Sequence, residues 1–185
     1  ARILLQKWEI KDEEQLIQKG IAETLWKGRM ELINENPFFM IDGAHNSHGV
    51  HALAESLKKL YPGEKFHFIM AVMADKDYEE MIEELLPLAI DFVTVTPESN
   101  RALQSKDLAE CIRKKGVKAR YVEDMEAVIR PLLPLKGTNP NLTVISKDSA
   151  ENHIYLPCAE HKIVAFGSLY FIGAIEAMLE KNNEI

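Results

Sequence analysis

The order of apolar and polar residues predicts strands that alternate with helices along most of the chain. Over 47–61 the apolar residues recur at the spacing of one helical face, at Val50, Leu53, Ala54, Leu57 and Leu60. A strand-like apolar run follows at 65–73. The pattern then predicts helices at 78–89, 105–115, 125–133 and 169–179, and strands at 92–96, 119–122 and 162–166. Alternation of this kind predicts an α/β fold with a Rossmann-like, mainly parallel sheet flanked by helices.

Two segments depart from the alternation. Near the start, 12–20 predicts a short helix, and 30–33 and 38–42 predict two strands joined by a turn, which form a short N-terminal hairpin. Between 135 and 161 the alternation of strands and helices is interrupted, and we interpret 136–161 as an insertion before the last strand. Within it, 142–145 is compatible with an added strand or hairpin.

Composition narrows the classes of function. The 185 residues are 46% hydrophobic and 28% charged, a balance typical of a globular chain with one core. The formal net charge is -7 and the basic residues are dispersed among acids, so the chain lacks the positive field that nucleic-acid binding requires. No apolar run approaches the ~20 residues that cross a bilayer, and we expect no membrane partner.

The cysteines and histidines give no indication of a metal. Cys111 and Cys158 belong to no spacing typical of zinc, and they fit a reducing environment, so we predict a cytoplasmic location. The histidines 45, 48 and 51 recur every three residues, but such steps turn each ring by about 60° around a helix. We therefore predict no metal site among them.

Ligands of open parallel sheets bind at the carboxyl ends of the strands, so chemistry is expected at the strand-to-helix junctions. The first junction is Asp42-Gly43-Ala44-His45-Asn46-Ser47. Asn46 or Ser47 suits the cap of the next helix. Asp42 and His45 would stand beside the positive end of that helix, where phosphate, ribose or carboxylate groups bind. The alternative is that Asp42 and Asn46 only satisfy amides of the turn.

Two other positions have similar alternatives. Ser168, in Gly167-Ser168-Leu169-Tyr170, is placed either to bind a carboxylate or to cap the last helix. Arg29 follows a glycine at the mouth of the hairpin, where a guanidinium would grip a phosphate, although an isolated surface arginine gives the same pattern.

The segment Ala74-Asp75-Lys76-Asp77 forms a third junction, in which Asp77 and Glu80 predict an acidic capping box. The sequence holds no phosphate-loop, dinucleotide or nucleophile-elbow motif. The chain is therefore not a self-sufficient P-loop enzyme.

Together these segments resemble a known family. The chain is similar to the carboxy-terminal domain of folylpolyglutamate synthase/dihydrofolate synthase, of the Mur ligase superfamily, in four segments: Trp26-Lys27-Gly28-Arg29-Met30-Glu31, Ile41-Asp42-Gly43-Ala44-His45-Asn46, Ala74-Asp75-Lys76-Asp77 and Gly167-Ser168-Leu169-Tyr170. The resemblance runs over about 13–179 and is interrupted by the insertion. Lys27 and Ser47 stand where the family usually has proline.

The resemblance implies an ATP-dependent ligase that adds L-glutamate to folate or dihydropteroate through an acyl phosphate. ATP and Mg²⁺ would be bound mainly by an N-terminal P-loop domain of the same polypeptide. By the same resemblance, Arg29 and Asp42 bind ATP, and His45 is catalytic and binds glutamate together with Ser168. Further candidates for the site are Asn46, Asp75 and Lys76.

We therefore expect 1–26 to be a helical lead-in from such an ATPase domain, and 27–185 to be a Mur-ligase-type C-terminal glutamate ligase domain. A start at Ala1 fits a part of a longer chain, and the domain alone is expected to be inactive because half of each composite site is missing. Two alternatives are a free-standing amino-acid or nucleotide-binding module and a Mur-type cell-wall ligase domain. A dinucleotide oxidoreductase is disfavoured by the missing glycine fingerprint.

Overall fold

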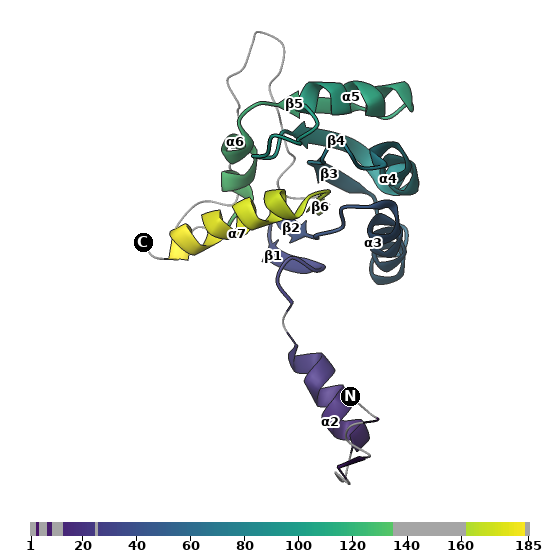
Figure 1. Cartoon of the computed structure of the whole chain (residues 1–185), viewed down its shortest axis with the longest axis vertical. Coiled ribbons are helices and arrows are strands. Elements are labelled where there is room, and N and C mark those ends of the chain that lie inside the picture. Colours follow the sequence, from purple (N-terminus) through teal and green to yellow (C-terminus); the bar gives the residue numbers. More distant parts are fainter. Residues whose placement is uncertain (1–2, 4–6, 9–12, 25, 135–161, 184–185) are drawn as a thin grey trace.

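A six-stranded sheet forms the centre of the computed structural model, which describes residues 3, 7–8, 13–24, 26–134 and 162–183 (Figure 1). The strands run across it in the order β1 (Glu31–Glu35), β2 (Phe38–Ile41), β6 (Lys162–Phe166), β3 (Phe66–Met70), β4 (Ala89–Val95) and β5 (Ala119–Val122). β1 pairs with β2 in antiparallel orientation, and all other neighbours are parallel. The predicted hairpin and mainly parallel sheet are confirmed.

Helices cover both faces of this sheet. α3 (Ser47–Leu60), α4 (Tyr78–Leu85) and α5 (Ser105–Lys114) lie on one face, and α6 (Met125–Ile129) and α7 (Leu169–Asn183) lie on the other (Figure 1). Strand residues alternate between two apolar cores: in β6, Val164 and Phe166 pack under α3–α5, whereas Ile163 and Ala165 pack under α6 and α7. None of the helices in the described part of the chain has the length and apolar content to span a bilayer.

Several predicted boundaries are wrong, and prolines explain two of them. The helix predicted at 78–89 ends at Leu85 and continues as a 3-10 turn, Leu86–Leu88, that contains Pro87. The helix predicted at 125–133 likewise gives way at Pro131 to a 3-10 turn. Proline lacks an N–H donor and crowds the preceding turn, so each α-helix stops there. β4 consequently starts at Ala89 and not at 92.

The strand predicted at 65–73 is shorter, because its last residues form hydrogen bonds outside the parallel sheet. The backbone leaves the ladder after Met70: Val72 accepts a hydrogen bond from the N–H of Leu103, and Met73 forms an isolated bridge with Ala102. The start of the chain contains α2 (Glu13–Glu23), close to the predicted 12–20. The predicted insertion at 136–161, including 142–145 and Cys158, lies outside the described residues.

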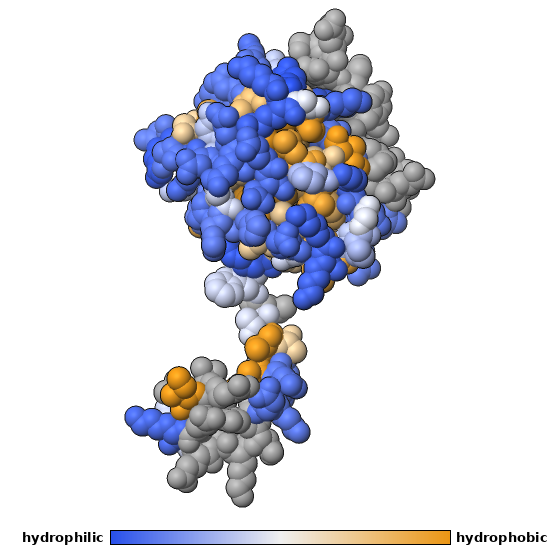
Figure 2. Space-filling view, turned by 90° about the vertical axis from the view of Figure 1, so that its right-hand side faces the viewer, coloured by the Kyte–Doolittle hydropathy of each residue, from blue (hydrophilic) through white to orange (hydrophobic). Residues whose placement is uncertain are grey.

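α2 projects away from the sheet (Figure 1). Its apolar residues Leu16 and Ile21 are 47% and 72% exposed, and Figure 2 shows apolar side chains open to solvent on this projection. A helix that leaves such side chains uncovered gains little from packing, and its apolar residues are available to another surface.

The order of the strands brings two distant junctions together. β6 is the last strand in the sequence but lies between β2 and β3, because the chain returns from β5 at the edge to the middle of the sheet. The N–H of Gly167, after β6, donates to the carbonyl of Ala44, after β2, at 2.9 Å. Gly167 has φ 113°, and a Cβ there would overlap the backbone of Ala71, so only glycine fits this crossing of three strand ends.

Candidate functional site

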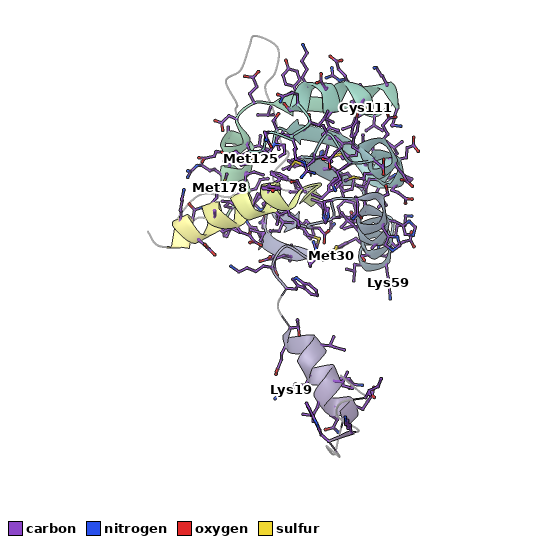
Figure 3. The ribbon with its side chains drawn as sticks, in the orientation of Figure 1. Lys19, Met30, Lys59, Cys111, Met125 and Met178 are labelled. Carbon is purple, nitrogen blue, oxygen red and sulfur yellow. The ribbon has the colours of Figure 1, made fainter. Side chains whose placement is uncertain are left out.

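A pocket of about 430 Å³ lies between the turn before β1 and the helix α3. It is lined by Arg29, Met30, Asp42, Gly43, Ala44, His45, Asn46, His48, Gly49, Ala52, Leu53 and Ser56. Figure 3 labels Met30, which lies where the chain enters the hairpin, on the side of α3. Four predicted site residues, from two separate motifs, therefore meet in one cavity at the carboxyl end of the sheet.

The backbone of the turn 28–30 aims Arg29 at this cavity. Gly28 has φ 64° and Met30 has φ 45°, so both neighbours of Arg29 adopt left-handed conformations. The carbonyl of Gly28 accepts a hydrogen bond from the N–H of Gly43 at 2.7 Å. The Arg29 guanidinium consequently lies against Gly43, where a Cβ would overlap its Nη1 atom.

The Arg29 side chain is exposed, and its guanidinium has few hydrogen-bond partners among the described residues. Its hydrogen bond to the carbonyl of Gly28 is long, at 3.4 Å, and no carboxylate in the described part of the chain pairs with it. A guanidinium has five N–H donors and stays charged at all working pH values. The geometry thus leaves a cation at the mouth of the pocket with donors available for an anion.

Asp42 joins the two motifs that line the pocket. It is 7% exposed, its Oδ2 accepts from the N–H of Met30 at 2.8 Å, and its Oδ1 accepts from the N–H of Ala44 at 2.7 Å. Satisfaction of turn amides, one of the two sequence-based interpretations, is therefore what the structure shows. A direct contact of Asp42 with ATP stays a prediction.

The His45 ring has a defined orientation. Its Nδ1 lies 2.9 Å from the carbonyl of Gly43, and because a carbonyl only accepts, Nδ1 bears the proton. The neutral ring then presents an unprotonated Nε2. Asn46 caps α3, accepting from the N–H of Gly49 at 2.8 Å, which confirms the capping prediction for this residue.

Ser168 lies at the same edge of the sheet. It is 2% exposed, and its Oγ accepts from the N–H of Tyr170 at 3.2 Å, so it caps the start of α7. The bond between Gly167 and Ala44 fixes this residue beside the His45 junction. Its hydroxyl proton is still available for donation, because the cap uses only the oxygen as acceptor.

The third junction does not join the pocket. Asp75 and Lys76 follow β3 and are not among its lining residues. Asp75 pairs with Arg101 at 2.5 Å, and this hydrogen-bonded guanidinium lowers the pKa of the Asp75 carboxyl. The predicted capping box is wrong: Asp77 makes no side-chain cap bond, and Glu80 accepts from the hydroxyl of Ser47 at 2.6 Å.

Two residues with a role in this geometry were not singled out by the sequence. Glu31, in β1, accepts from the N–H of Gly28 through Oε2 at 2.6 Å. Gly43 leaves the space that the Arg29 side chain occupies. Both belong to the motifs quoted above, and an acid placed three residues after a glycine is the only local signal of the first contact.

Of the three histidines at 45, 48 and 51, the first two line the pocket and the third does not. His51 is exposed and its Nδ1 lies 3.1 Å from Oε2 of Glu84 on α4, away from the pocket. Within the ranges that the structure describes, no group of three or more His, Cys, Asp or Glu residues is arranged to hold a metal ion.

Sequence relatives of the chain are glutamate ligases. The family model described as "Mur ligase, glutamate ligase domain" matches residues 28–146. The dihydrofolate synthase/folylpolyglutamate synthase of Bacillus subtilis is 28% identical, and the match covers 96% of this chain and 37% of the relative. The folylpolyglutamate synthase of Lacticaseibacillus casei is 33% identical over 56% of this chain and 24% of its own length.

Solved structures show the same fold. The folylpolyglutamate synthase of Mycobacterium tuberculosis, solved in complex with ADP and AMPPCP, superposes with a TM-score of 0.70 at 24% identity, covering 91% of this chain and 36% of that chain. The folylpolyglutamate synthase of Thermotoga maritima gives 0.64 at 23% identity, with 91% and 34% covered. This chain thus spans about a third of the length of these relatives. It belongs to the glutamate ligase domain family of the Mur ligases, and it matches the C-terminal domain of folylpolyglutamate synthases.

Proposed function

We propose that this chain is the glutamate-handling domain of an ATP-dependent ligase that joins L-glutamate to folate or dihydropteroate. The observation that supports this most strongly is the pocket in which Arg29 and His45, from separate motifs, face the same space. One side chain is a permanent cation and the other offers a free ring nitrogen, which suits a site that holds a phosphorylated group and an amine together.

Arg29 is the residue that we assign to the phosphates of ATP. ATP supplies the phosphoryl group that activates the acceptor carboxylate as an acyl phosphate. The guanidinium can bind phosphate oxygens through two N–H groups and offset their negative charge. Because Gly43 and the turn 28–30 define its direction, this charge is oriented before substrate arrives. Asp42 would act at the same place, by direct contact with ATP or by holding the turn.

His45 and Ser168 are the residues that we assign to glutamate. The unprotonated Nε2 of His45 can accept a proton from the glutamate ammonium, and the resulting amine attacks the acyl carbon as phosphate leaves. The Ser168 hydroxyl can donate to a glutamate carboxylate while its oxygen keeps the helix cap. Lys76 is half-buried in the turn between β3 and α4 and is a candidate for a second contact with a glutamate carboxylate, whereas Asp75 beside it already pairs with Arg101.

The remainder of the active site would belong to an N-terminal P-loop domain, to which 1–26 leads. Support comes from the sequence, which has no phosphate-loop motif, and from the exposed apolar residues Trp26, Leu169 and Tyr170 near this edge. We assign Mg²⁺ to that domain as well, since its preferred oxygen ligands are not gathered in the described part of this one. The cysteine usage supports a cytoplasmic enzyme.

The test is a kinetic assay of the full-length protein that contains this chain, with dihydropteroate and tetrahydrofolate as acceptors. We expect ADP formation that depends on both glutamate and acceptor, and that is lost in Arg29→Ala and His45→Ala. His51→Ala is the matched control, because His51 is exposed and outside the pocket. If neither acceptor supports glutamate-dependent turnover, the ligase assignment fails and a binding module becomes the better account.

A further inference from the structure

We propose that Glu31 is a positioning residue that fixes the direction of Arg29, a role that rests on the proposed function of Arg29 in binding ATP. Glu31 opens β1, and its Oε2 accepts a hydrogen bond from the N–H of Gly28 at 2.6 Å. Hydrogen bonds to a carboxylate are shorter and stronger than those between neutral groups. The carboxylate therefore holds the backbone immediately before Arg29.

A second carboxylate holds the backbone immediately after Arg29. The N–H of Met30 donates to Asp42 at 2.8 Å. Arg29 thus lies between two residues whose N–H groups are each bound to a different acid, one from β1 and one from the end of β2. The two acids hold the residues on either side of Arg29.

The turn needs such restraint because one of its residues, Met30, has an unfavourable backbone conformation. Gly28 and Met30 have φ values of 64° and 45°. A residue with a Cβ adopts positive φ at a cost, so Met30 keeps this conformation only when its surroundings impose it. Asp42 holds Met30 directly, and Glu31 adds a second restraint, because without it the N–H of Gly28 loses its partner and this end of the turn is held less firmly.

The carboxylate of Glu31 does not pair with the guanidinium of Arg29. No ion pair joins the two residues in the described structure, where the Arg29 guanidinium bonds to a carbonyl and the Glu31 carboxylate to a backbone N–H. A guanidinium paired with Glu31 would be partly neutralised before a phosphate arrived. Binding the backbone instead lets an acid orient the cation and leaves its donors for the ligand.

The experiment is a double-mutant cycle on the full-length protein with Glu31→Ala, Arg29→Ala and the double variant. If Glu31 acts through Arg29, Glu31→Ala raises KM and Kd for ATP by about tenfold. The same change made in the Arg29→Ala background then has no further effect on either constant. Glu31→Gln retains an acceptor oxygen and is expected to recover most of the loss. Glu35→Ala is the matched control, since Glu35 is an exposed acid in the same strand.

Melting temperatures of all variants separate positioning from folding. A Glu31→Ala protein that melts earlier but keeps the wild-type KM and Kd for ATP overturns the proposal, and so do additive losses in the cycle. Absence of glutamate-dependent turnover in the wild type would refute the proposed function instead. In that case the Kd for ATP, measured on the same four proteins, still decides whether Glu31 acts through Arg29.

Discussion

The guanidinium of Arg29 lies against the backbone of Gly43, in space that any other residue would fill with its Cβ. The N–H of the same glycine donates to the carbonyl of Gly28, one residue before the arginine, at 2.7 Å. The turn 28–30 and the junction after β2, which are separate in the sequence, therefore pack directly against each other. This contact places the Arg29 cation at the end of β2, where the pocket opens.

Gly43→Ala should impair nucleotide binding more than folding. The added Cβ would meet the ends of the flexible Arg29 and Leu169 side chains, which can move away, and the carbonyl of Gly28 at 3.1 Å, which must shift slightly. Because the guanidinium is displaced, we expect kcat/KM for ATP in the full-length enzyme to fall about ten- to hundredfold. Steady-state kinetics measure this effect.

The matched control for that variant is Gly173→Ala in α7, where a Cβ would have no atom within 4 Å. It should keep wild-type kinetics and gain about 0.5–1 kcal/mol of stability, since alanine is favoured over glycine in a helix. Equal kinetic losses in the two variants would show that Gly43 has no particular relation to Arg29.

Gly167→Ala should, in contrast to Gly43→Ala, destabilise the fold. Gly167 has φ 113°, and a Cβ there would overlap the backbone of Ala71, which cannot rotate out of the way. We expect the free energy of unfolding to fall by at least about 2 kcal/mol. Urea denaturation of this chain, followed by circular dichroism, gives the value. A variant as stable as the wild type would mean that the three strand ends are not packed as described.

His45→Ala should affect glutamate and not ATP. Loss of the Nε2 acceptor is expected to lower kcat/KM for glutamate about 10²- to 10³-fold in the full-length enzyme, with an unchanged Kd for ATP. His51→Ala removes only an exposed pair with Glu84 and should stay within about twofold of the wild type. A weaker affinity for ATP in His45→Ala would place this residue on the nucleotide and refute its assignment to glutamate.

Ser168 can be tested for its two roles separately. Ser168→Ala removes the cap of α7 and should cost about 1 kcal/mol of stability, whereas Ser168→Gly should cost only about a few tenths, because glycine is tolerated at that position. Both variants lack the hydroxyl, so both should raise KM for glutamate by about tenfold. If KM for glutamate rises in Ser168→Ala but not in the more stable Ser168→Gly, the hydroxyl only caps the helix and does not bind glutamate.

The parts of the fold that the sequence predicts are those with a repeating pattern. The helix α3 (Ser47–Leu60) and the strand β6 (Lys162–Phe166) agree closely with their predicted ranges, since each buries a regular set of apolar positions against the sheet. The helix predicted at 78–89 was too long because its apolar pattern continues through Pro87, and the pattern does not register the missing N–H donor.

The residues of the candidate site were predictable where a motif ends a strand, and their partners were not. Arg29, Asp42, His45 and Asn46 do line one pocket. The hydrogen bond between Glu80 and Ser47 crosses from α4 to α3, so a local capping pattern could not anticipate it. Likewise, nothing in the sequence distinguishes an Asp42 that binds a ligand from one that bridges two amides, because the answer depends on where the turn 28–30 lies.

The most direct test of the central claim is the mass of the product formed by the full-length protein. Incubation with ATP, Mg²⁺, L-glutamate and either dihydropteroate or tetrahydrofolate should give a product heavier by one glutamyl residue, and Arg29→Ala and His45→Ala should not form it. The acceptor that is converted identifies the activity. An acceptor that returns with unchanged mass in every mixture, from a protein that is folded and binds ATP, would contradict the assignment as a glutamate ligase.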